Sequence, residues 1–328
     1  MGGAQVSQLP NYQITKLLNC LTPKPSIGLV GAGSLAAALA PALHQAGYRI
    51  TEIVSRDQPR SRRRARRLAE TVGARPVTMA TAQFPSPLLW LCVSDSAIAG
   101  CARDLAGRTN WAGKIAFHSS GALSADALDP LRQRGAWAAS LHPMMSFVPR
   151  SRPSLKGIGF AVEGDSRAAA VASRVARDLG GTVFRIRRAD KVLYHAWASF
   201  ASPLLVTLLA VGEEVAGEAG IKPAAAKRII QPIVRRTIDN YFAHGAAAAF
   251  SGPLVRGDLA TVHAHLRQLR RIPQAKEVYR LLARTALANL PVAKRQQMAA
   301  LLKATSQKGA AENKQQATSR KRQARKGH

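Results

Sequence analysis

Cysteine, long apolar runs and acidic side chains are all scarce in this chain of 328 residues. Its three cysteines, Cys20, Cys92 and Cys101, follow no metal-binding or redox spacing, so zinc modules and disulfide scaffolds are excluded and a reducing compartment is favoured. The longest apolar run, Pro203 to Val211, is too short to cross a bilayer, and no apolar signal segment precedes Cys20. We therefore expect a soluble, cytoplasmic protein without a membrane partner.

Acidic residues are few beside the basic ones: the chain has 18 Asp and Glu against 48 Lys and Arg, and its formal net charge is +30. Part of this charge follows Lys303, and the rest lies on the body of the chain, with a dense run from Arg56 to Arg67. Aromatic residues make up only 5%, do not interleave with the basic ones, and form no RNA-recognition signature. A solvated basic surface is favoured over a nucleic-acid partner, with weak contact through the tail at most. The alternative, that the arginine run and the tail bind nucleic acid, stays open.

Strand and helix patterns alternate between residues 25 and 187, after a polar and aperiodic leader at residues 1–24. The predicted strands cover residues 27–30, 50–54, 88–93, 115–117, 138–141, 157–162 and 182–186. The apolar run at residues 88–93 is typical of a strand that is buried on both faces of a parallel sheet. The alternation predicts a doubly wound α/β domain over residues 25–187.

The pattern after Arg187 is entirely helical. Helices are predicted over residues 191–219, 223–243, 258–269, 274–289 and 292–303. Pro203 should kink the first of these helices, because it cannot donate to the carbonyl of Ser199. Helices that are apolar on several faces usually pack against a partner, so we expect a homodimer through this domain of residues 188–303. The tail, residues 304–328, is basic and should be disordered.

The most informative segment begins at the first predicted strand and enters a helix through two glycines. Gly31, Gly33 and Ala36 have the G-x-G-x-x-G/A spacing of a dinucleotide-binding turn. Gly31 permits the tight turn, and Gly33 allows backbone N–H groups to approach a pyrophosphate at the helix N-terminus. The predicted cofactor contacts here are Gly31, Ala32, Gly33, Ser34 and Leu35. The alternative is an ordinary strand–helix turn of a flavodoxin-like sheet.

The end of the second predicted strand favours NADP over NAD. Ser55 and Arg56 stand where NAD-specific proteins usually place an acid for the ribose, and a hydroxyl with a guanidinium suits a 2′-phosphate. Asp57, one step later, keeps NAD(H) possible. Val93 and Ser94 follow the third predicted strand and are expected to contact the cofactor, although Ser94 also has the type and place of a helix N-cap.

Two histidines stand at successive strand ends. His118 begins the segment that continues with Ser119, Ser120 and Gly121, and His142 ends the next predicted strand. Histidine can orient a carbonyl or exchange a proton near neutral pH, so both are catalytic candidates. We expect Ser119 to contact the cofactor, and Ser120 and Gly121 to contact the substrate. The alternative is that each histidine only bonds the backbone of its own loop.

A polar stripe opens the helical half. Lys191, Tyr194, His195, Ala198 and Ser202 share one helix face by their spacing. A cation near a helix N-terminus is not favoured by the helix dipole, which indicates a functional reason for the lysine. The stripe therefore predicts three catalytic candidates and, in Ser202, a substrate contact; solvent exposure is the alternative.

A turn over residues 252–258 leads into a later helix. Asp258 is a suitable N-cap there, and Arg256 could bind a substrate carboxylate with both guanidinium nitrogens. His263 and His265 are two residues apart and face different directions, so they do not form a metal pair. No hydrolase, zinc or ATP-binding motif is present.

These motifs together resemble one family, the Rossmann-like proteins with domain of unknown function 2520. The resemblance rests on Gly-Leu-Val-Gly-Ala-Gly-Ser-Leu-Ala from Gly28, His-Ser-Ser-Gly-Ala-Leu-Ser-Ala-Asp from His118, Leu-His-Pro-Met from Leu141, Tyr-His-Ala from Tyr194 and Gly-Pro-Leu-Val-Arg-Gly-Asp from Gly252. Such proteins are similar in plan to pyrroline-5-carboxylate reductase and the β-hydroxyacid dehydrogenases. The resemblance covers about residues 25–290. It implies an NADP-binding Rossmann domain, a helical dimerisation domain like the C-terminal one of 6-phosphogluconate dehydrogenase, and a site between them.

Two departures from the family pattern concern the site. Ser202-Pro203 replaces the usual Ser-Asn, and His195 follows Lys191 where related dehydrogenases have asparagine, so Lys191 is a proton donor by analogy only. The sequence as a whole predicts an NADP-dependent reductase or dehydrogenase for a small anionic keto or imine substrate. The alternative is an NADP-binding sensor or partner protein that catalyses no reaction.

Overall fold

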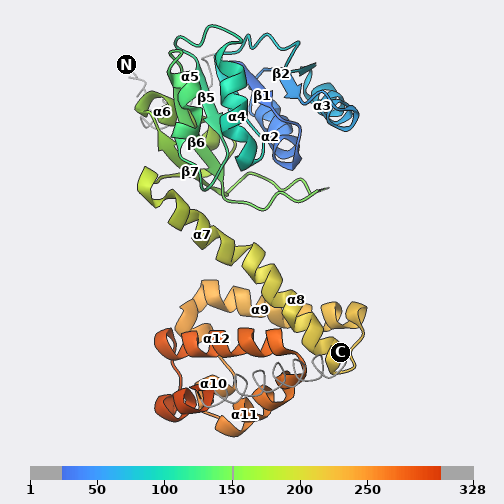
Figure 1. Cartoon of the computed structure of the whole chain (residues 1–328), viewed down its shortest axis with the longest axis vertical. Helices are drawn as coiled ribbons and strands as arrows, with labels where there is room; N and C mark the ends of the chain where they lie inside the picture. Colours follow the sequence, from blue (N-terminus) through green and yellow to red (C-terminus); the bar gives the residue numbers. More distant parts are fainter. Residues whose placement is uncertain (1–23, 150, 304–328) are drawn as a thin grey trace, which may run out of the picture. The chain divides into compact units, whose positions relative to one another are not determined.

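The computed structural model describes residues 24–149 and 151–303 (Figure 1). The chain divides into two compact units, and the division falls between Ser202 and Pro203. The predicted leader, apart from Lys24, and the predicted basic tail lie outside the described residues.

The first unit is built around one sheet of eight strands. The strands are β1 (Ile27–Val30), β2 (Ile50–Ser55), β3 (Arg75–Thr78), β4 (Leu88–Leu91), β5 (Ile115–His118), β6 (Trp137–Pro143), β7 (Gly159–Gly164) and β8 (Thr182–Arg185). Their order is β3-β2-β1-β4-β5-β6-β7-β8, and only the pair β6–β7 is antiparallel. The doubly wound α/β prediction is confirmed. Strand β3 was not predicted, because this short edge strand has no apolar run and none of its residues is buried.

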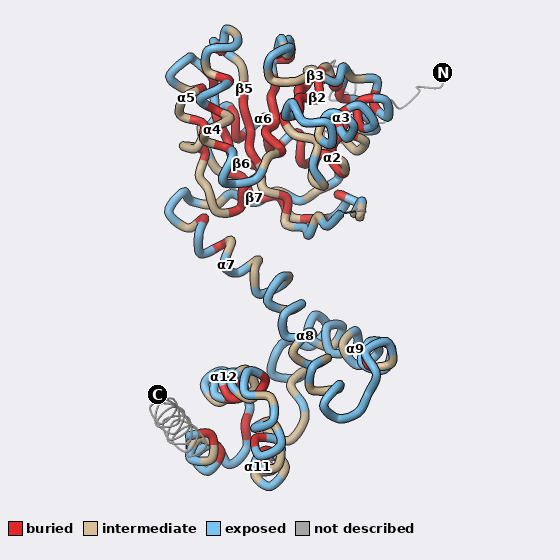
Figure 2. Tube along the Cα trace, turned by 45° about the vertical axis from the view of Figure 1, so that its right-hand side comes forward, coloured by how far each residue is buried: buried red, intermediate tan, exposed pale blue. Residues whose placement is uncertain are grey.

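Helices cover both faces of this sheet, and each face has its own apolar core. One core joins the sheet to α2 (Ser34–Gln45), α3 (Pro59–Val72) and α6 (Ser166–Asp178). The other joins it to α4 (Asp95–Ala106) and to a helical turn that continues into α5 (Asp129–Arg132). Figure 2 shows the strands as a buried layer in this unit. Such a doubly covered sheet leaves the ends of its strands as the accessible place for a ligand.

The prediction of one continuous helix over residues 191–219 is wrong. The structure has α7 (Lys191–Ala201) and α8 (Pro203–Glu218), separated by Ser202 with φ −129° and ψ −83°. A proline disfavours helical geometry in the residue before it, so the expected kink is a complete break. As a result, α7 belongs to the unit that holds the sheet, and α8 begins the second unit.

The second unit is helical. It contains α8, α9 (Pro223–Ala249), α10 (Pro253–Arg256), α11 (Leu259–Gln268), α12 (Pro273–Asn289) and a helix through residues 295–303. The Asp258 side chain accepts a hydrogen bond from the Thr261 backbone N–H at 3.0 Å, so the predicted N-cap of α11 is confirmed. The apolar core of the second unit includes Val262 and Met298. Helices α8 and α9 are largely exposed (Figure 2).

One helical stretch of the described chain, Arg188–Glu218, is long and apolar enough to cross a membrane by length and composition alone. This stretch is longer than the apolar run noted in the sequence, Pro203 to Val211, which lies inside it. The stretch is broken at Ser202, and Lys191 and Tyr194 are buried in the first unit. We therefore treat it as two separate helices rather than as one membrane span.

Candidate functional site

The carboxyl ends of the parallel strands bring two groups of residues to one edge of the sheet. We call the first the glycine pocket, which lies around the end of β1. We call the second the polar cluster, which lies around the carboxyl ends of β5 and β6 and consists of Asp95, Ser120, Ser140, His142, Lys191, Tyr194 and His195. The loop after β4 joins them, because Ser94 lines the pocket and Asp95 belongs to the cluster.

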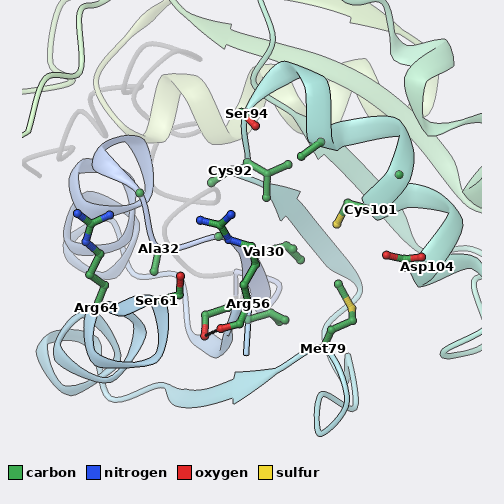
Figure 3. Close-up of a pocket in the computed structure, with 17 residues that line it drawn as sticks. Val30, Ala32, Arg56, Ser61, Arg64, Met79, Cys92, Ser94, Cys101 and Asp104 are labelled. Atoms are coloured by element: carbon green, nitrogen blue, oxygen red, sulfur yellow. Dashed lines mark hydrogen bonds between the residues drawn. The ribbon is translucent and has the colours of Figure 1, made fainter. Parts of the chain in front are cut away.

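The glycine pocket is a cavity of about 570 Å³ (Figure 3). Most of the predicted cofactor residues line it: Gly31, Ala32, Gly33, Ser55, Arg56, Val93 and Ser94. Ser34 and Leu35 begin α2 next to it and are not among the lining residues. The hydroxyl of Ser119 accepts a hydrogen bond from the Trp90 indole at 2.6 Å, outside the pocket. Ser94 occupies the N-cap position of α4, but its side chain makes no capping bond.

Glycine is needed at the two positions of this turn for different physical reasons. Gly31 has φ +110°, and a Cβ there would lie 2.5 Å from the carbonyl oxygen of Cys92. Gly33 has open space where its Cβ would be, and it faces the pocket. The N-cap residue of α2 is Gly33, which has no side chain to cap the helix, and the first turn of α2 has no acidic residue. This turn therefore offers free backbone N–H groups and a positive helix end to a phosphate, as the spacing predicts.

Basic groups of α3 extend the pocket beyond the predicted residues. The guanidinium group of Arg56 lies in the middle of the pocket, with Ser61 and Arg64 from α3 beside it (Figure 3). Asp57, the residue that would favour NAD, instead binds Arg62 at 3.1 Å and does not line the pocket. Two guanidinium groups and a hydroxyl fit a phosphate on the ribose. The sequence analysis missed Ser61 and Arg64, although their spacing of three on a helix places them on one face.

Lys191 is the buried centre of the polar cluster. Its side chain is 1% exposed, and Nζ donates to Ser140 Oγ at 2.6 Å and to the Ser120 carbonyl at 3.2 Å. Burial lowers the pKa of Lys191 from its ordinary value of 10.5 to about 8, although the carboxylates of Glu163 and Asp95 oppose this shift. The ammonium group is thus held by the strand ends instead of by solvent, and the exposure considered for Lys191 is wrong.

Two residues that the sequence analysis missed complete the surroundings of the lysine. Ser140 donates from Oγ to the Ser120 carbonyl at 3.1 Å, and Ser120 donates from its own Oγ to Asp95 at 2.6 Å. Ser140 lies within β6 and Asp95 begins α4, so neither stands directly at a predicted strand end. Only the pairing of β5 with β6 brings Ser140 beside the loop of Ser120.

Tyr194 and His142 form the second pair of the cluster. The Tyr194 hydroxyl and His142 Nδ1 are 2.6 Å apart and share one hydrogen-bonding proton. Burial, followed by the positive charge of Lys191, lowers the pKa of His142 to about 4, and burial raises the pKa of Tyr194 to about 12. At neutral pH the imidazole is therefore neutral and the phenol keeps its proton.

His195 approaches the same imidazole. The rings of His195 and His142 are 6.0 Å apart between centroids and nearly perpendicular. A Cβ on Gly121 would lie 2.5 Å from His195 Cδ2 and 2.9 Å from His142 Nε2. Gly121 thus allows the loop after β5 to approach both histidines, which is the structural basis of its predicted place in the site.

His118 is placed differently from His142. It is fully buried, its Nδ1 accepts from the Ser120 backbone N–H at 3.1 Å, and its Nε2 donates to the Ser124 carbonyl at 2.9 Å. Burial also lowers its pKa to about 4, so the ring is neutral. No ring nitrogen is left for a substrate, and we assign His118 a structural role in shaping the loop that carries Ser120.

The remaining two predicted substrate residues are Ser202 and Arg256. Ser202 sits at the break between α7 and α8 and is half-buried, not on the stripe predicted for it. Arg256 is exposed at the end of α10 in the second unit, and its contact with a substrate stays a prediction.

Two protein-family models match different parts of the chain. Residues 15–143 match the Rossmann-like domain, and residues 158–286 match the domain of unknown function DUF2520. The resemblance seen in the motifs is therefore confirmed. No curated protein sequence matches the chain.

Solved structures share the fold over most of the chain. A protein from Bacteroides fragilis described as an NADP oxidoreductase is 24% identical, with a TM-score of 0.68 over 80% of this chain and 98% of its own. A Thermotoga maritima protein is 25% identical, with a TM-score of 0.63 over 79% and 96%. An imine reductase from Myxococcus stipitatus in complex with NADP+ is 16% identical, with a TM-score of 0.57 over 80% and 94%.

Proposed function

Because the chain consists of a Rossmann-like domain followed by a DUF2520 domain, we propose that it is an NADP(H)-dependent oxidoreductase. Its substrate is a small, acidic keto or imine compound that is reduced beside the polar cluster. The observation that carries this proposal is that two neighbouring residues after β4 belong to the two groups: Ser94 lines the glycine pocket, and Asp95 accepts a hydrogen bond from Ser120, whose carbonyl accepts from Lys191. Oxidoreductases of similar fold, among them an imine reductase, support it.

The residues of the glycine pocket fit NADP(H) better than NAD(H). The backbone N–H groups of the turn at Gly33 would hold the pyrophosphate, and Arg56, Ser61 and Arg64 would hold the 2′-phosphate. NAD(H) can enter the same pocket but would leave these basic groups without a partner. The bound cofactor supplies the hydride, which the protein itself does not provide.

Tyr194 is the proton donor in this proposal. Reduction of a C=N or C=O bond adds a hydride at carbon and a proton at nitrogen or oxygen. A protonated phenol that shares a hydrogen bond with neutral His142 can release its proton and draw another through the imidazole. His195, which packs edge-on against that imidazole, is half-buried.

Lys191 is a positioning residue in this proposal. It is 1% exposed and makes bonds to the loop of Ser120 and to Ser140, so it fixes the strand ends that carry the cluster. Burial lowers the pKa of His142, and the positive charge of Lys191 lowers it further, so the imidazole stays neutral. Arg256 would bind the carboxylate of an acidic substrate. Its position in the turn over residues 252–258, directly before Gly257 and Asp258, supports this role.

A direct test combines binding with turnover. Calorimetry with NADPH and NADH measures affinity and selectivity, and consumption of NADPH is then followed with a panel of keto acids and cyclic imines. Turnover of at least one panel member with preferential NADPH binding would support the oxidoreductase. Tight NADPH binding without any turnover would favour the alternative of a sensor, and no binding of either nucleotide would overturn both.

We also propose that the protein is a cytoplasmic homodimer that associates through the second unit. The support is an exposed apolar surface on α8 and α9, where Val206, Ile229, Ile233 and Phe242 are all more than half exposed. Apolar areas of this kind usually mark an interface. Light scattering should give a dimer for the unmodified chain and a monomer for the variant Ile233→Glu.

A further inference from the structure

Helix α3 carries a concentration of arginines, of which the proposed function uses only Arg64. The helix places six of them within two turns: Arg60, Arg62, Arg63, Arg64, Arg66 and Arg67. All six are exposed, because the apolar residues of the helix form a buried stripe on its other side. Arg60, Arg63, Arg64 and Arg67 have the spacing of one outward face, and we call these four the arginine face.

The arginine face is electrostatically unfavourable in the isolated chain. Within the described residues, Arg62 pairs with Asp57, and none of the arginine face has an ion-pair partner. Like charges three and four residues apart repel one another, and the positive N-terminal end of the helix adds to the repulsion. The first turn has no acidic residue and no capping side chain to offset this. A partner with several regularly spaced negative charges would remove the repulsion.

The surroundings of the arginine face decide which polyanion fits. No large apolar or aromatic side chain is exposed between residues 49 and 75, among those that the structure describes. Protein interfaces need such anchors at their centre, and peripheral membrane helices need an apolar face to insert. Unpaired bases need aromatic platforms to stack on. The phosphate backbone of a duplex needs only spaced cations.

The arginine face also borders the nucleotide site, because Arg64 belongs to both and Arg56 lies next to it in the glycine pocket (Figure 3). We propose that the arginine face binds the phosphate backbone of duplex nucleic acid, and that NADP(H) competes with the duplex for Arg64 and Arg56. The competition rests on the proposed function; binding of the duplex by the arginine face does not. The sequence alone favoured a solvated surface, since it did not show that these arginines share one unpaired face beside the pocket.

The first experiment measures duplex binding by fluorescence anisotropy with the full chain, using a labelled DNA duplex and an RNA duplex of the same length. Each phosphate neutralised contributes about −0.9 to the slope of log affinity against log salt on B-DNA, so the arginine face together with Arg56, five arginines in all, gives a slope of roughly −4 to −5. Comparison of the two duplexes identifies which backbone is preferred. No binding of either duplex at low salt would overturn the proposal.

A matched pair of variants assigns the binding to the arginine face. The variant Arg60→Gln/Arg63→Gln/Arg67→Gln should reduce the slope by about 3, weaken duplex binding at least roughly tenfold, and leave NADPH affinity unchanged. Arg108→Gln/Arg134→Gln/Arg177→Gln removes the same charge from exposed sites elsewhere on the first unit and should retain most of the affinity. Equal loss in both variants would mean that net charge or the tail is responsible, and would overturn the proposal.

Competition with the cofactor tests the shared arginines. Saturating NADPH should weaken duplex binding several-fold and reduce the slope by about 2, because Arg56 and Arg64 are then occupied. Saturating NADH, which lacks the 2′-phosphate, should do less. Duplex binding that NADPH leaves unchanged would overturn the sharing. A chain that binds the duplex but neither nucleotide would refute the proposed function and leave the arginine face supported.

Discussion

The glycine pocket and the polar cluster lie on the same edge of one sheet, yet they are built in opposite ways. The pocket contains a continuous run from the strand into the turn, Val30 to Gly33, to which β2, α3 and α4 add further lining residues. The cluster is formed by side chains far apart in sequence: Lys191 is 71 residues from its partner Ser120 and 51 from Ser140. Local geometry therefore prepares a cofactor site, whereas the chemistry depends on the assembled fold.

The largest expected effect comes from removing the Tyr194 hydroxyl, which is the proposed proton donor of the polar cluster. Tyr194→Phe keeps the ring that packs edge-on against His142 and deletes the shared proton. We expect kcat to fall by about 10²- to 10⁴-fold, the usual contribution of a positioned proton donor, with NADPH affinity unchanged. Steady-state kinetics with the best substrate of the panel, and calorimetry with NADPH, measure the two quantities.

The chain contains a matched control for this change in its second unit. Tyr279 and His265 form the same kind of pair, with the hydroxyl 3.1 Å from Nδ1 and nearly perpendicular rings. Tyr279→Phe should leave kcat within about twofold, because this hydrogen bond is exposed and such bonds contribute only about 1 kcal/mol. An equal loss of kcat in both variants would show that Tyr194 acts through stability rather than as a proton donor.

The next effect concerns the buried lysine and pH. Its pKa is about 8 in the folded chain against 10.5 ordinarily, so between these values the unfolded chain binds more protons and stability rises with pH. Below pH 8 the buried ammonium group lowers the free energy of unfolding by its full amount. As the pH rises above 8 the lysine loses its proton, and the free energy of unfolding increases by about 3 kcal/mol at most. The variant Lys191→Met cannot show this gain.

The measurement is the free energy of unfolding of both chains in denaturant from neutral to alkaline pH. The difference between the unmodified chain and Lys191→Met isolates this titration from that of the other groups. We expect the unmodified chain to gain stability relative to the variant as the pH rises above about 8. A constant difference would mean that Lys191 is solvated rather than buried.

A smaller effect belongs to the glycine pocket, at a residue that sequence did not reveal. Arg64→Ala should weaken NADPH binding by about 10- to 100-fold, since hydrogen bonds to charged groups contribute about 1.5–3 kcal/mol, and should leave NADH binding unchanged. Arg108→Ala, exposed and outside the pocket, is the control. Equal losses for the two nucleotides would place Arg64 elsewhere than at the 2′-phosphate.

The contrast between the two groups also explains what sequence could predict. The parallel sheet and the turn at Gly31 follow from apolar runs and glycine spacing, which are local patterns. Lys191 and Tyr194 were found because helical spacing places them on one face. Ser140 and Asp95 were missed because their roles depend on which strands are neighbours in the sheet. The structural role of His118 also required the loop that it bonds, since a histidine at a strand end looks the same in sequence whether it is free or satisfied.

The smallest expected effects come from one methyl group added to each region. At Gly121 a Cβ would collide with the rings of His195 and His142, so Gly121→Ala should destabilise the fold by about 1–3 kcal/mol and lower kcat while NADPH affinity is kept. At Gly33 the Cβ would enter open space in the pocket, so Gly33→Ala should keep stability and weaken NADPH instead. Thermal unfolding and calorimetry on both variants give the comparison. The opposite result, in which Gly33→Ala lowers stability and Gly121→Ala weakens NADPH binding, would contradict the assignment of the glycine pocket to the cofactor and of the polar cluster to the reaction. That assignment depends on the open space at Gly33 and on the close contacts at Gly121.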